Sequence, residues 1–95
     1  MIGIERIAAE QKRQIEEEGF TAEHDDCWIK GQMAKAAMCY CMEPGDGEDD
    51  HIPDEWPWPS AWWKPTCPDN RIRELEKAGA LIAAEIDRLL RLEEI

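Results

Sequence analysis

The sequence predicts a single all-α domain of three helices, a helical hairpin followed by a long C-terminal helix. Three observations support this prediction. Apolar residues recur at helical spacing in three segments, no segment alternates with period two, and all six prolines lie between residues 44 and 68. A chain of 95 residues can bury one small core and is too short for a two-domain enzyme. Residues 1–95 are therefore expected to form one helical domain, with residues 43–68 as a connector that is first acidic and then rich in proline and tryptophan.

The first helix is predicted over about residues 3–18, because one face repeats at helical steps and charged residues fill the others. Gly19 is a natural C-terminal stop for this helix. Residues 20–26 then form a short connector, in which Thr21 or the Asp25–Asp26 pair can cap a helix. The apolar face of the first helix consists of Ile4, Ile7, Ala8, Gln11 and Ile15.

A second helix is predicted from Cys27 or Ile29 to Met42. Gly31, near its start, costs about 1 kcal/mol relative to alanine inside a helix. It indicates either a close approach by another backbone or a later helix start. The residues expected to share the buried face of this helix are Ile29, Met33, Ala36, Ala37 and Tyr40.

The last helix is predicted from a cap at Asp69 or Asn70 to about Leu92. Its apolar residues follow a heptad-like seam, and a cluster of small residues at 78–84 would let a neighbouring helix approach closely. The apolar face is too wide for two short helices to cover, which predicts a homo-oligomer through this helix. The alternative is that the tryptophan-rich segment covers the surplus. The seam consists of Ile72, Leu75, Gly79, Ile82, Ile86 and Leu89.

The overall charge of the chain restricts the classes of function that are expected for it. The chain carries 22 acidic and 11 basic residues, a formal net charge of −11. This balance argues against direct DNA binding, which needs a basic surface. No apolar run approaches the roughly 20 residues that span a bilayer, and no signal-peptide pattern opens the chain, so we expect a cytoplasmic protein with no membrane partner. The four cysteines are expected to be reduced thiols.

The segment 56–65 contains four tryptophans within eight positions, separated by prolines and one serine-alanine pair. Indole rings stack on bases or fill pockets of a partner, and neighbouring prolines reduce the ordering cost of binding. The alternative is that these rings form a lid over the helical core, with a short helical turn at Ser60–Trp63. The candidate binding residues here are Trp56, Trp58, Trp62 and Trp63, with Lys64, Arg71 and Arg73 placed to meet phosphates.

Two acidic stretches, residues 16–26 and 43–55, contain no lysine or arginine. They are typical of a solvated surface, and the alternatives are a mimic of nucleic acid or a site for a hard cation such as Mg²⁺. His24, Asp25 and Asp26 in the first stretch complete the set of candidate ligand- or partner-binding residues. His24 and Cys27 have H-x-x-C spacing, but zinc frameworks usually need two such close pairs.

Several motifs together resemble a family of small phage and prophage accessory proteins. They are the run Ile7-Ala8-Ala9-Glu10-x-x-Arg13-Gln14-Ile15, the stretch 19–26, Trp56-Pro57-Trp58, Trp62-Trp63-Lys64-Pro65 and residues 77–89. These motifs cover most of the chain outside the acidic 43–55 stretch. The resemblance implies an accessory protein that acts in a bacterial host cytoplasm, and it supplies no activity.

A second resemblance is to MazG-like all-α nucleotide pyrophosphohydrolases, which hold Mg²⁺ with E-E-x-x-E and E-x-x-D motifs. Thr21 stands where the first motif needs its third glutamate, and Arg88 stands where the second needs aspartate. The carboxylates that the resemblance would assign to Mg²⁺ are Glu10, Glu17, Glu85 and Asp87. Nucleophilic catalysis has no motif here, because the single serine, Ser60, lies among prolines and tryptophans.

The leading hypothesis from the sequence is a non-catalytic phage accessory protein without a cofactor. It would bind a host protein or a small nucleotide signal and so inhibit host antiviral defence. The alternatives are a divergent Mg²⁺-dependent nucleoside triphosphate pyrophosphohydrolase, an acidic mimic of nucleic acid and a purely structural module.

Overall fold

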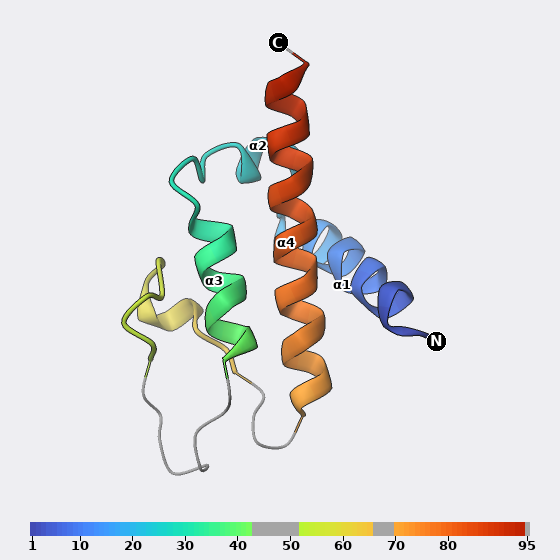
Figure 1. Ribbon diagram of the computed structural model, residues 1–95, viewed down its shortest axis with the longest axis vertical. Helices are drawn as coiled ribbons and strands as arrows, with labels where there is room; N and C mark the ends of the chain where they lie inside the picture. Colours follow the sequence, from blue (N-terminus) through green and yellow to red (C-terminus); the bar gives the residue numbers. More distant parts are fainter. Residues whose placement is uncertain (43–51, 66–69, 95) are drawn as a thin grey trace.

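The computed structural model describes residues 1–42, 52–65 and 70–94, and within these ranges the secondary structure is entirely helical (Figure 1). This confirms the predicted all-α class. The long C-terminal helix is confirmed as well, and a short additional helix lies in the first connector. The elements are α1 (Gly3–Glu18), α2 (Ala22–Asp25), α3 (Gln32–Cys41), the 3₁₀ turn η1 (Ser60–Trp62) and α4 (Arg71–Glu93).

Helix α4 is the centre of the fold, and both α1 and α3 pack against it. Figure 1 shows α3 running beside α4 in the opposite direction, while α1 crosses behind α4. The antiparallel pair is therefore α3 with α4, joined through the tryptophan-rich segment. Helices α1 and α3, which are the first two long helices of the chain, do not form an antiparallel pair with each other. This arrangement leaves three elements, α1, α3 and residues 52–65, around one side of α4.

The ends of the long helices follow the sequence signals. The Ile2 amide donates to Glu5 Oε1 at 2.9 Å at the start of α1. Gly19 ends that helix with a φ of 74°, in the left-handed region that glycine adopts without strain. At the start of α4 the Arg73 amide donates to Asn70 Oδ1 at 3.0 Å. Asn70 is therefore the cap, as the sequence allowed.

The region between α1 and α3 differs from the prediction. Thr21 caps α2, where its hydroxyl accepts from the His24 amide. Gly31 has a φ of 77° and begins α3 at Gln32, which is the later start that the glycine indicated. Ile29 consequently lies before the helix and is 69% exposed. The expectation that Ile29 shares the buried face was wrong, because a left-handed residue interrupts the helical path before Met33.

The core is small and lies between α3 and α4. Trp28 and the indoles of Trp56, Trp58 and Trp63 pack against it, so the tryptophan-rich segment does cover part of the helical core. Small side chains let the two helices approach closely, and the aromatic rings supply much of the remaining apolar area. The buried residues of the cluster are Met33, Ala36, Ala37 and Tyr40 of α3 with Ala78, Leu81 and Ala84 of α4.

Helix α1 approaches α4 most closely at Gly79. A Cβ built on Gly79 would lie 2.5 Å from Ile7 Cδ1 and 2.7 Å from Ile7 Cγ1. These distances are shorter than real Cβ contacts, so the absence of a side chain at position 79 is what admits Ile7. The expectation that small residues in this helix permit close packing is confirmed at this position.

The apolar seam of α4 lies outside the core. Ala78, Leu81 and Ala84 face inward, whereas the seam residues lie on the other side of the helix. Gly79 faces α1 and is the exception. A surface row of this kind is unusual for an amphipathic helix, whose larger apolar side chains normally face the core. The row, called the α4 stripe below, consists of Ile72, Leu75, Ile82, Ile86, Leu89 and Leu90, which are between 45% and 59% exposed.

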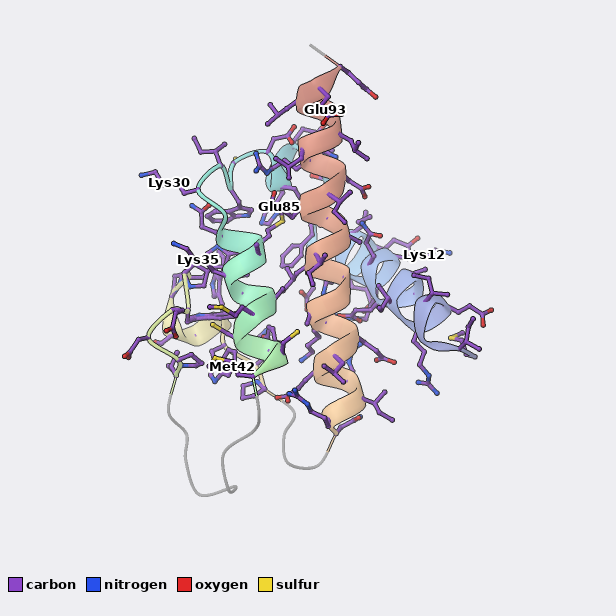
Figure 2. All side chains as sticks on the ribbon, viewed as in Figure 1. Lys12, Lys30, Lys35, Met42, Glu85 and Glu93 are labelled. Carbon is purple, nitrogen blue, oxygen red and sulfur yellow. The ribbon has the colours of Figure 1, made fainter. Side chains whose placement is uncertain are left out.

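Arg71 joins the start of α4 to the end of α3. Its Nη1 donates to the carbonyl oxygens of Tyr40 and Met42, both at 2.9 Å, and its Nη2 donates to that of Cys41. Figure 2 labels Met42 at the end of α3 nearest the start of α4. The guanidinium thus caps carbonyls that the helix itself leaves unpaired and places a positive charge at the negative end of α3.

Some sequence predictions lie outside the described residues. These include most of the second acidic stretch (43–51), with His51, and the positions of Cys67 and Asp69. Among the described helices, none combines the length and the apolar character that crossing a bilayer requires.

Candidate functional site

A cavity of about 650 Å³ lies on the side of α4 where α1, α2, α3 and the tryptophan-rich segment meet. This volume falls within the usual range of about 300–1,000 Å³ for small-molecule sites. Most of its lining consists of two kinds of side chain, which meet where Lys77 lies over the Tyr40 ring. The aromatic group comprises Phe20, His24, Tyr40, Trp56, Trp58 and Trp62, and the charged group comprises Glu10, Arg13, Glu18, Lys64, Arg73 and Lys77.

The aromatic group is held by ring-to-ring packing. Phe20 and His24 stack with centroids 4.7 Å apart, and Tyr40 meets Trp56 edge-on at 5.6 Å. Trp58 lies between its two neighbours, 5.5 Å from Trp56 and 5.9 Å from Trp62. The prolines and η1 fix the backbone of this segment, so the rings are positioned before any ligand arrives.

The indole of Trp58 carries an unsatisfied donor. Its Nε1 is buried and has no acceptor among the described residues, and the same is true of Trp28 Nε1. By contrast, Trp56 Nε1 donates to the Pro59 carbonyl at 3.2 Å. A buried N–H without an acceptor is destabilising by about 1–3 kcal/mol, so each of these two indoles carries that cost in the folded protein.

Glu10 organises the charged group. The side chain is 3% exposed, accepts from Arg13 Nε at 2.8 Å and Nη2 at 3.0 Å, and forms an ion pair with Arg73. Gln14 Nε2 donates to it at 3.0 Å. Burial raises the pKa of Glu10, but the hydrogen bonds from Arg13, Arg73 and Gln14 outweigh burial and lower that pKa to about 2. Glu10 is therefore an ionised anchor that holds two guanidinium groups at the cavity wall.

Arg13 also contacts two acidic residues at the end of α1. Its Nη1 lies 3.4 Å from Glu17 Oε2, and its Nη2 lies 3.2 Å from Glu18 Oε1. Glu18 lines the cavity and Glu17 does not. Arg13 is therefore shared between a buried carboxylate and two more exposed ones.

Lys77 and Tyr40 attach the tryptophan-rich segment to the helices. Lys77 Nζ donates to the Lys64 carbonyl at 2.8 Å and lies 5.7 Å from the centre of the Tyr40 ring. The Tyr40 hydroxyl accepts from the Lys64 amide at 3.3 Å. Burial, together with the positive charge of Arg73, lowers the pKa of Lys77. These contacts therefore fix the cavity wall where Lys64 meets α3 and α4.

Six of the ten residues singled out in the sequence line this cavity, namely Trp56, Trp58, Trp62, Lys64, Arg73 and His24. The other four lie elsewhere. Trp63 is partly buried and stacks on Tyr40 at 4.9 Å against the core, and Arg71 caps α3. Asp25 is buried beside His24, with its Oδ1 3.2 Å from His24 Nδ1, and Asp26 pairs with Arg91 at 2.7 Å.

The sequence reasoning missed the contribution of α1 and Tyr40. Glu10, Arg13 and Gln14 were assigned to charged faces or to a motif, yet Glu10 and Gln14 are the buried residues of α1. The available signal was the i, i+3, i+4 spacing, which places these three side chains on one face of a helix. Tyr40 and Lys77 had no comparable signal, since their role depends on where residues 56–65 lie.

The carboxylates considered for Mg²⁺ do not form one cluster. Glu10 pairs with Arg13 and Arg73, and Glu17 also contacts Arg13. Glu85 and Asp87 lie further along α4, where Arg88 and Gln11 respectively bind them. Across the described ranges, no group of three or more histidine, cysteine, aspartate or glutamate side chains is arranged to hold a metal ion.

Comparisons with known proteins add no relative, because no protein-family model, curated protein or solved structure matches the chain.

Proposed function

We propose that this protein is a non-catalytic binding protein whose ligand is a small nucleotide. The observation that carries the proposal is that the cavity places an aromatic group beside a cationic group in a chain of net charge −11. Its lining contains four cationic side chains, Arg13, Lys64, Arg73 and Lys77, and two acidic ones, Glu10 and Glu18. Glu17 and Glu76 also pair with the two arginines from outside the lining, whereas no carboxylate of the described residues pairs with Lys64 or Lys77. Two lysines without a carboxylate partner beside an aromatic wall favour a ligand that is both planar and negatively charged.

The two groups match the two parts of a nucleotide. A base can stack on Trp62, which is 45% exposed, or on Trp56, which lies on the other side of Trp58. Arg13 and Arg73 can bind phosphate oxygens, since guanidinium groups recognise phosphate with paired hydrogen bonds. Trp58 lies between the rings of Trp56 and Trp62 and adds aromatic surface to the same wall.

The acidic residues that were considered for catalysis are engaged in ion pairs or hydrogen bonds, and this favours a binding function over a hydrolytic one. Glu10 has a pKa of about 2 and accepts from three side chains, so it is a poor general base at neutral pH. Glu85 and Asp87 are engaged by Arg88 and Gln11. These pairings support a protein that holds its ligand unchanged.

The resemblance to small phage accessory proteins supports a biological setting for this binding. A protein that retains a nucleotide without altering it removes that nucleotide from solution. In the cytoplasm of a bacterial host, this would inhibit an antiviral defence that depends on a nucleotide signal. The defence role rests on the resemblance and on the cavity together.

The proposal includes a homo-oligomer formed through α4. The α4 stripe combines the heptad-like spacing of a helix-pairing seam with side chains that are about half exposed, and a second copy of α4 is an occupant of matching chemistry. The stripe lies on a different side of α4 from cavity residues Arg73, Lys77 and Leu81, which follow i, i+4, i+8 spacing. Pairing through the stripe would therefore leave the cavity open.

Titration with nucleotides tests the proposal. Adenosine 5′-monophosphate, cyclic AMP and cyclic di-AMP would be added to the protein, with heat of binding and tryptophan fluorescence as the two readouts. We expect saturable binding of at least one of them with quenching of fluorescence. Trp62→Ala should weaken that binding about tenfold, since base–aromatic stacking contributes about 1–3 kcal/mol. The control is Trp63→Phe, which keeps an aromatic ring against the core at a position that does not line the cavity.

The same experiment discriminates the other partner considered in the sequence analysis. If none of the three nucleotides binds at millimolar concentration, the cavity is not a nucleotide site and the proposal fails. A host protein that binds through Trp62 would then be the remaining partner class.

A further inference from the structure

The side chain of Glu18 lines the cavity at the point where Arg13 presents a hydrogen-bond donor. Its Oε1 is 3.2 Å from Arg13 Nη2, and it is the second acidic residue of the lining beside the buried Glu10. Glu10 is held from several directions, whereas among the described residues Glu18 forms an ion pair with Arg13 alone, and its side chain is 37% exposed. A carboxylate in this position accepts from Arg13 Nη2, a donor that a phosphate oxygen would also use.

The position of Glu18 in its helix makes this contact easy to break. Glu18 is the last residue of α1, and its neighbours Glu16 and Glu17 are also acidic. Negative charge is unfavourable at a helix C-terminus, because the carbonyl ends of the helix already carry partial negative charge. Release of Glu18 into solvent therefore lets its carboxylate move away from the helix end while it frees one N–H of Arg13 Nη2.

We propose that Glu18 occupies the anion subsite of the empty cavity and that the ligand's phosphate displaces it from Arg13. This inference rests on the proposed nucleotide function and adds the regulation of that site. The exchange selects for ligands that carry an anion, because a neutral aromatic compound cannot replace the ion pair that Glu18 makes. The ligand class is therefore a phosphorylated nucleoside, bound with its phosphate on Arg13 and its base against the indoles.

Glu17 provides the matched control. It contacts the same guanidinium at 3.4 Å and carries the same charge, but it does not line the cavity. Glu17→Gln and Glu18→Gln change the net charge equally and both remove an acidic residue from the end of α1. Any effect of overall charge or helix stability is therefore common to the two variants, and displacement from the subsite is specific to Glu18.

The test measures binding of adenosine 5′-monophosphate and of adenosine to wild type, E17Q and E18Q by calorimetry. We expect E18Q to bind the monophosphate about two- to fivefold more tightly than E17Q, the effect expected when a partly exposed ion pair no longer has to be broken. Adenosine should bind the two variants equally. Circular dichroism would verify that both variants are folded.

Three other results would overturn the inference in distinguishable ways. Equal monophosphate affinity of E17Q and E18Q, with binding retained, rejects the displacement of Glu18 and leaves nucleotide binding intact. Tighter binding of adenosine to E18Q shows that Glu18 opposes the base and does not mimic the phosphate. Absence of monophosphate binding in wild type and both variants rejects the proposed function itself, and this inference with it.

Discussion

The carboxylate of Glu10 in α1 forms a buried ion pair with Arg73 in α4, so the contact that joins the two helices also forms the cationic wall of the cavity. The same carboxylate fixes Arg13 from within α1. Stability and the binding site are therefore coupled through one side chain. This coupling makes the pH dependence of folding a probe of the site.

Glu10→Gln should reduce the free energy of unfolding by about 3 kcal/mol at pH 7, because removal of a buried charge leaves two guanidinium groups less well paired. The pKa of Glu10 is lowered from 4.5 to about 2 in the folded chain. The stabilisation is therefore complete above pH 4.5 and is lost as the pH falls towards 2. Urea unfolding of both proteins at pH 7 and pH 2.5 measures this. If the difference in unfolding free energy between wild type and Glu10→Gln is the same at both pH values, the assignment of the lowered pKa to Glu10 is wrong.

Gly79→Ala should destabilise the protein, although alanine is the better helix former by about 1 kcal/mol. The added Cβ would meet Ile7 Cδ1 at 2.5 Å, and such overpacking typically costs about 1–3 kcal/mol. Gly3→Ala is the control, because its Cβ would meet nothing within 4 Å. Thermal unfolding of the two variants should therefore shift in opposite directions. A stabilised Gly79→Ala variant would show that α1 does not pack on α4 in this way.

Ile82→Glu should convert the proposed oligomer into a monomer, since a charge in the α4 stripe would oppose helix pairing. Analytical ultracentrifugation of wild type and variant provides the measurement. Ile29→Glu is the matched control, as Ile29 is also exposed but lies in the segment before α3. If wild type sediments as a monomer at high micromolar concentration, the oligomer through α4 is wrong.

Trp58→Phe should weaken binding of adenosine 5′-monophosphate about three- to tenfold, because the smaller ring removes aromatic area from the cavity lining. The stability of the free protein should change by less than about 1 kcal/mol. The substitution removes a buried N–H that has no acceptor in the described part of the protein, so folding loses no hydrogen bond there. Trp56→Phe removes an N–H that donates to the Pro59 carbonyl, and it should cost about 1 kcal/mol of stability. Calorimetry and urea unfolding of the pair separate the two roles. Unchanged nucleotide affinity in Trp58→Phe would assign that indole to packing alone.

The sequence was sufficient for the parts of the fold that depend on local signals. Gly19 ends α1, Asn70 begins α4, and the helical turn among the tryptophans is present as η1. Each of these follows from the backbone preferences of a few adjacent residues. The late start of α3 was one of two alternatives, because Gly31 alone does not show whether it lies inside a helix or before it.

The sequence predicted the residue types of the cavity but not which of these residues would line it. The tryptophans, Lys64 and Arg73 were recognisable as candidates by residue type, but Arg71 is also a cation near the same rings and instead caps α3. Which arginine faces the cavity depends on the rotation of α4 against α3, and no local pattern encodes it. For the same reason the seam of α4 was recognised as apolar, while its position outside the core could not be read from its spacing.

The central claim is that one cavity binds a base and a phosphate together, and calorimetry with the wild-type protein tests it most directly. Adenosine 5′-monophosphate, adenosine and inorganic phosphate would be compared at the same ionic strength. The account predicts that the monophosphate binds at least about tenfold more tightly than either part alone, because the aromatic and cationic groups act on one molecule. A monophosphate that binds no more tightly than adenosine would contradict it.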